Sequence, residues 1–75
     1  MNDLRTKRLL QAMAAVDEGS RLIAQQTALI DRIRARGGSI ELPQRVLAAM
    51  ESLQRAREVY FGILWEAATK QSHPH

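Results

Sequence analysis

The sequence lacks cysteine altogether, and it has only two prolines and three aromatic residues. Without cysteine the chain has no disulfide, no thiolate metal site and no cysteine nucleophile. Strands favour β-branched and aromatic residues, yet Val, Phe, Tyr and Trp together number six, against eleven Ala and nine Leu. In a chain of 75 residues, this composition favours one small all-α domain.

Long apolar runs are also missing. No run approaches the roughly 20 residues that a membrane-spanning helix requires, and the sequence beginning Met1-Asn2-Asp3 shows no apolar leader segment. We therefore expect a cytoplasmic protein without a membrane partner.

Positive charge is in modest excess. Eleven Lys and Arg against eight Asp and Glu leave a formal net charge of +3, and all of that excess falls in residues 1–37. Basic side chains can neutralise phosphates, so six of them are candidate nucleic-acid contacts: Arg5, Lys7, Arg8, Arg32, Arg34 and Arg36.

Two segments show the three-, four- and seven-residue apolar spacing that is typical of amphipathic helices. We predict one helix over about 3–36, a turn over about 37–41 with Gly37-Gly38 ending the first helix, a second helix over about 42–70 and a frayed tail over 71–75. The apolar stripe of the first helix is predicted at Leu9, Met13, Val16, Ile23, Ile30 and Ile33, beside Leu22 and Leu29. That of the second is predicted at Val46, Ala49, Met50, Leu53, Ala56, Tyr60, Ile63, Leu64 and Ala67.

The short connection makes the two helices fold back as an antiparallel hairpin, so residues 1–75 form one domain. Gly19-Ser20 lies inside the first pattern and could break it, since Gly costs about 1 kcal/mol relative to Ala in a helix. The apolar spacing from Val16 to Ile23 stays in phase across it. We therefore predict a continuous helix in which Gly19 lets another helix approach closely.

The segment 59–65, Val-Tyr-Phe-Gly-Ile-Leu-Trp, is apolar all round the helix. With Tyr60, Ile63 and Ala67 facing the first helix, Phe61 and Trp65 point elsewhere, and a helix that is apolar on every side is normally buried on every side. One interpretation folds these two side chains over the N-terminal segment near Leu4 and Leu9. The one we favour pairs two hairpins into a homodimeric four-helix bundle. Its predicted interface residues are Val59, Phe61, Leu64, Trp65 and Gly19.

No residues are spaced for catalysis. Adjacent helical carboxylates such as Asp17 and Glu18 diverge by about 100°, and both histidines, His73 and His75, stand at the C-terminal end, two potential ligands without a third. Gly37-Gly38 lacks the lysine and the strand of a phosphate-binding loop. We expect no enzyme, no metal and no cofactor.

The segment from Val16 to Gln26, Val-Asp-Glu-Gly-Ser-Arg-Leu-Ile-Ala-Gln-Gln, resembles the opening of a group of short alphaproteobacterial proteins. These read His-Val-x-Glu-Gly-x-x-x-Ile-x-x-Gln, then a Leu-Ile pair, a Gly-containing turn and a Leu-Leu helix. The matching later elements here are Leu29-Ile30, Gly37, Val46-Leu47 and the segment Met50 to Leu53. The resemblance covers about 15–65. It departs at Ala15, where the group has His, and at the turn after Gly37, where the group often has Gly-His-Asp-Thr. It implies a bacterial helical hairpin and no activity.

The sequence therefore predicts a non-enzymatic helical module that binds another protein, or itself. The alternative is a small nucleic-acid-binding regulator that uses the six basic residues named above.

Overall fold

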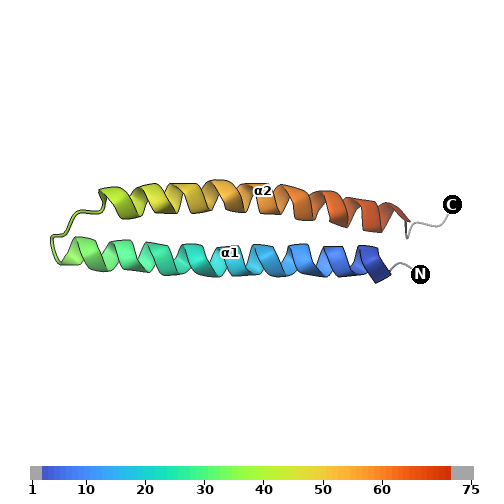
Figure 1. Ribbon diagram of the computed structural model, residues 1–75, viewed down its shortest axis with the longest axis horizontal. Helices are drawn as coiled ribbons and strands as arrows, with labels where there is room; N and C mark the ends of the chain where they lie inside the picture. Colours follow the sequence, from blue (N-terminus) through green and yellow to red (C-terminus); the bar gives the residue numbers. More distant parts are fainter. Residues whose placement is uncertain (1–2, 72–75) are drawn as a thin grey trace.

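Two antiparallel helices make up the described part of the protein, as predicted. The computed structural model describes residues 3–71, and within them α1 spans Asp3–Ala35 and α2 spans Glu41–Gln71. Figure 1 shows the two helices side by side along their whole length, with both ends of the chain at one end of the molecule. The predicted boundaries lie within one residue of these, and α1 runs unbroken through Gly19. Most of the predicted tail, residues 72–75, lies outside the described residues.

The turn between the helices begins with a glycine-terminated helix end. The Gly38 amide donates to the Ile33 carbonyl at 2.9 Å, and the Gly37 amide donates to the Arg34 carbonyl at 3.0 Å. This pair of bonds is the Schellman arrangement, which needs a left-handed residue just past the helix. Gly37 supplies it with a φ of 77°. The chain thus turns within five residues, which brings α2 back against α1.

Each helix turns one regular stripe of side chains toward the other. On α1 the buried and half-buried members are Leu9, Ala12, Val16, Gly19, Ile23, Gln26, Ile30 and Ile33. On α2 they are Pro43, Leu47, Met50, Gln54, Arg57, Phe61, Leu64 and Ala68, which we call the inner stripe. The spacing alternates between three and four residues throughout, as in coiled coils. Contact between these stripes is what holds the hairpin together.

The predicted stripe of α1 is largely correct, but most of the predicted stripe of α2 is wrong. Met13 of α1 is exposed, and on α2 Tyr60 and Ile63 lie outside the stripe that packs against α1, at 51% and 60% exposure. The α2 stripe is shifted by one residue along the chain, which rotates it by about 100° round the helix. The shift arises because the true inner stripe contains Pro43, Gln54 and Arg57, which a search for apolar residues passes over.

Two glutamines connect the helices by hydrogen bonds to backbone carbonyls. The Gln54 side-chain amide donates to the Val16 carbonyl at 2.8 Å and to the Ser20 hydroxyl at 3.1 Å. Near the turn, Gln26 donates to the Pro43 carbonyl at 3.0 Å. A hydrogen bond forms only within a narrow range of distance and angle. These bonds therefore favour one register of α1 against α2.

The hairpin buries few of its side chains. Its principal extents are 61 × 15 × 15 Å, and among residues 4–70 the buried hydrophobic side chains are Ala12 and Ile30 alone. The chain exposes 5982 Å², whereas a compact protein of 8.5 kDa exposes about 4,700 Å². The two-helix arrangement thus leaves on the order of 1,300 Å² more surface in water than a globular chain of this mass.

Candidate interaction surface

A second apolar stripe on α2 lies beside the inner stripe, about 100° round the helix from it. It comprises Leu42, Val46, Ala49, Leu53, Ala56, Tyr60, Ile63 and Ala67, which we call the outer stripe. All eight residues are exposed, and the five larger side chains range from Val46 at 43% to Leu42 at 69%. None carries a charge, so the outer stripe is more uniformly apolar than the inner one. An uninterrupted apolar stripe about 38 Å long, at 1.5 Å per residue, is the main chemical feature of this surface.

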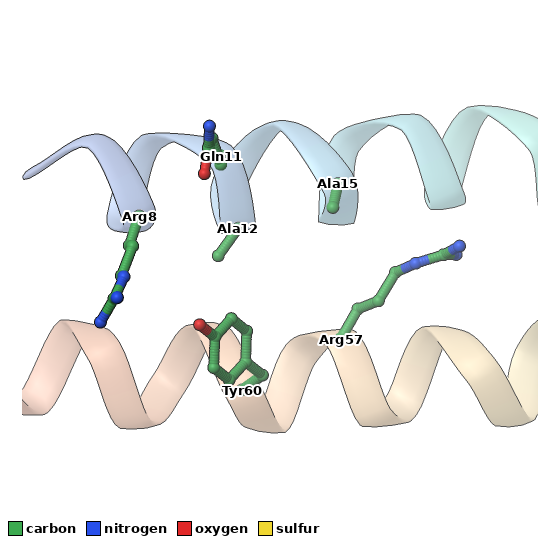
Figure 2. A pocket seen from close by; sticks show the side chains of 6 residues that line it. All are labelled: Arg8, Gln11, Ala12, Ala15, Arg57 and Tyr60. Atoms are coloured by element: carbon green, nitrogen blue, oxygen red, sulfur yellow. The ribbon is translucent and has the colours of Figure 1, made fainter. Parts of the chain in front are cut away.

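The apolar surface continues from the outer stripe onto α1. Tyr60 shares a shallow hollow of about 190 Å³ with Ala12 and Ala15, and Arg8 and Arg57 line its ends. In Figure 2 the Tyr60 ring points toward Ala12 between the two arginines, which extend from opposite helices. Small side chains on α1 create this hollow.

Further along α1, Leu22 and Leu29 follow Ala15 at seven-residue intervals and so share its side of the helix. Leu22 is half-buried, and Leu29 is exposed. The outer stripe together with Ala15, Leu22 and Leu29 forms one apolar face that spans both helices, which we call the interaction face.

The five predicted interface residues lie on different sides of the hairpin. Gly19 is buried against α2 of the same chain, and Phe61 and Leu64 belong to the inner stripe. Val59 and Trp65 are exposed, at 63% and 52%. The Phe61 and Trp65 rings lie 6.2 Å apart at a tilt of 32°.

Trp65 projects on the side of α2 opposite the outer stripe, because it follows Phe61 by four residues and Ile63 by two. Leu4, near which the alternative interpretation placed Phe61 and Trp65, is 59% exposed. The single hairpin therefore covers Phe61 in part and leaves Trp65 half in water.

The six basic residues form two separate groups. Arg5 and Arg8 border a hollow with Leu64 and Ala67 near the chain ends, and Lys7 is exposed beside them. The exposed Arg32, Arg34 and Arg36 stand at the turn, about 36 Å away from Arg8 along α1 at 1.5 Å per residue. Arg34 also approaches Asp31 to 4.0 Å. The fold does not bring the two groups into one basic patch.

Gly19 serves a close contact within the hairpin. A Cβ atom at Gly19 would lie 1.8 Å from Oε1 of Gln54 and 3.0 Å from the Arg57 guanidinium. Gln54 is only 5% exposed, and its Oε1 atom has no hydrogen-bond partner. The absence of a side chain at position 19 thus makes room for the Gln54 amide, a role that neither residue shows in the sequence alone.

This contact predicts strong coupling between positions 19 and 54. In the native background, Gly19→Ala displaces Gln54 from its bonds, and we expect the free energy of unfolding to fall by about 1 kcal/mol. With Gln54→Ala already present, the same change should raise it by about 1 kcal/mol, because Ala favours the helix. Urea unfolding of the four proteins measures both values. Equal effects of Gly19→Ala in the two backgrounds would contradict the contact.

Charged groups on the surface pair locally. The Arg21 guanidinium donates to the Glu18 carboxylate, with Nε and Oε1 3.0 Å apart, and this bond lowers the pKa of Glu18 and raises that of Arg21. Arg45 donates to Glu41 at 3.0 Å. Within residues 4–70 the only buried polar side chain is Gln54, which does not titrate. The surface chemistry of this part of the chain is therefore that of exposed ion pairs around an apolar face.

Within the described part of the chain, no three His, Asp or Glu residues cluster as metal ligands. Over the same residues, neither helix contains a segment that is long and apolar enough to cross a membrane.

Comparison with known proteins identifies no family for this chain. The chain matches no protein-family model, no curated protein and no solved structure.

Proposed function

We propose that this protein is a non-enzymatic helical interaction module that self-associates through its interaction face. The observation that carries the proposal is the outer stripe, in which eight consecutive heptad positions are apolar, uncharged and exposed. Exposed apolar surface on this scale marks a binding site in proteins that remain soluble. The hairpin turns its more polar stripe inward and leaves its fully apolar stripe outside.

The area of the hairpin supports a partner of similar size. A standard interface buries about 800 Å² on each partner, and the hairpin exposes on the order of 1,300 Å² more than a compact chain of its mass. A second hairpin packed lengthwise would cover much of that excess. The proposed product is a four-helix bundle, in which each helix contacts two neighbours.

Nucleic-acid binding has weaker support. Phosphate contacts gain from a continuous basic surface, and the two basic groups stand at opposite ends of α1. We expect the protein to bind generic DNA or RNA only at low salt. Tight binding at physiological salt that Arg32→Ala/Arg36→Ala abolishes would favour the nucleic-acid function instead.

Sedimentation equilibrium of the full chain tests the proposal. We expect the apparent mass to rise from that of one chain, 8.5 kDa, to twice that value with increasing concentration, and to reach the dimer at micromolar concentration. Trp65 fluorescence recorded on the same samples should keep the emission of a partly exposed indole, since Trp65 lies outside the interaction face. A single-chain mass at every concentration would overturn the proposal.

A further inference from the structure

We propose that the occupant of the outer stripe is a second copy of this chain, packed with α2 antiparallel to α2 and with the two-fold axis between Leu53 and Ala56. This inference rests on the proposed self-association and adds the orientation and the register. In this register Leu42 meets Ala67 of the second copy, Val46 meets Ile63, Ala49 meets Tyr60 and Leu53 meets Ala56.

The sizes of the paired side chains carry the register. In three of the four pairs a large residue faces an alanine: Leu42 with Ala67, Tyr60 with Ala49, and Leu53 with Ala56. In the fourth pair the two β-branched side chains, Val46 and Ile63, face each other. Alternation of large and small residues lets facing layers interdigitate at the density of a protein interior.

A parallel pairing would fit poorly. It would place Tyr60 on Tyr60, Leu53 on Leu53 and alanines on alanines, which leaves gaps at some levels and overlaps at others. In the antiparallel register, Leu42, Leu53 and Tyr60 each have an alanine opposite.

Charge beside the stripe supports the same direction. Arg45 and Glu66 precede Val46 and Ala67 by one residue and lie along one border of the outer stripe. Helical side chains tilt toward the N-terminus of their own helix, so in an antiparallel pair Arg45 of one copy comes level with Glu66 of the other, twice per dimer. In a parallel pair the same border of the two helices lies on opposite sides of the seam, so Arg45 would not meet Glu66. Arg45 is exposed where it bonds Glu41, so it is free to rotate to a new acceptor.

The angle between the inner and outer stripes of α2 determines how the four helices are arranged. Members of the outer stripe directly precede members of the inner stripe in the sequence, as Leu53 precedes Gln54 and Tyr60 precedes Phe61. Neighbouring helical residues diverge by about 100°, so α1 and the second copy lie nearly at right angles around α2. The two-fold axis then carries both α1 helices to the same side of the α2 pair, where Leu22 and Leu29 face inward.

Cysteine crosslinking of the otherwise cysteine-free chain tests the register. Val46→Cys and Ile63→Cys in one chain lie about 26 Å apart along α2 at 1.5 Å per residue, too far to react with each other. In the proposed dimer the thiol at position 46 of one copy faces the thiol at position 63 of the other copy. We expect Val46→Cys/Ile63→Cys to form covalent dimers with a short bis-maleimide at least roughly tenfold faster than either single variant, because proximity raises the effective concentration.

Leu10→Cys/Val46→Cys is the matched control, since it keeps the thiol at position 46 and moves the second one to an exposed position of α1 that lies away from the interaction face. We expect it to react as slowly as the single variants, with all four proteins equally helical by circular dichroism. Rapid dimer formation by Val46→Cys alone would show a parallel pair. A dimer by sedimentation without Val46–Ile63 crosslinks would overturn the register and leave self-association intact, whereas monomeric sedimentation would overturn both.

Discussion

Leu53→Glu is expected to dissociate the dimer into single hairpins. Leu53 lies at the centre of the outer stripe and is 52% exposed in the single chain, so the substitution adds little cost to the hairpin itself. In the dimer it would place two carboxylates close to the two-fold axis in an apolar interface, at a cost of several kcal/mol. We expect the dissociation constant to rise by more than roughly 100-fold, equivalent to about 3 kcal/mol.

The matched control is Leu10→Glu, which makes the same chemical change at a residue of α1 that is 56% exposed and lies away from the interaction face. Sedimentation should show a monomer for Leu53→Glu and a dimer for Leu10→Glu at the same concentration. Equal masses for the two variants would place the interface elsewhere on the hairpin.

Ile30→Ala is expected to cause the largest loss of stability among single truncations. Ile30 is 4% exposed, the lowest value of any large apolar side chain between residues 4 and 70. Removing a buried isoleucine side chain costs about 2–5 kcal/mol, a large share of the stability of so small a domain. We expect the Tm to fall by about 10–20 °C.

Leu10→Ala provides the comparison, because it removes a similar volume from a largely exposed position. Thermal melts followed by circular dichroism should show a shift of only a few degrees for this variant. A comparable loss of Tm in both would mean that the core of the hairpin is not centred on the stripe that contains Ile30.

Local signals in the sequence were enough to predict the hairpin. The Gly37-Gly38 pair marked the end of α1 because a left-handed glycine is the usual way to end a helix, and the structure places Gly37 in that conformation. The heptad spacing across Gly19 predicted a continuous helix, which is confirmed. These features depend on residues close together in the chain, and so they can be seen without the fold.

The choice of inner stripe on α2 could not be made from hydrophobicity. Two heptad stripes run one residue apart, and the more apolar of them is the one left outside. What decides between them is long-range: the bonds of Gln54 to Val16 and Ser20, and the space beside Gly19 that admits the Gln54 amide. A glutamine at a heptad position interrupts the apolar pattern, so a search for apolar spacing leaves it out of the inner stripe. The contacts of Gln54 with α1 become visible only when both helices are placed.

Small-angle X-ray scattering of the native protein tests the central claim most directly. A single hairpin has a radius of gyration of 17.3 Å over its Cα atoms. Two hairpins packed lengthwise at helix-packing distance double the scattering mass, yet raise the radius of gyration only to about 18 Å. We predict that result at concentrations where sedimentation shows the dimer. A doubled mass with a much longer particle, or the mass of one chain, would contradict the lengthwise pairing of outer stripes.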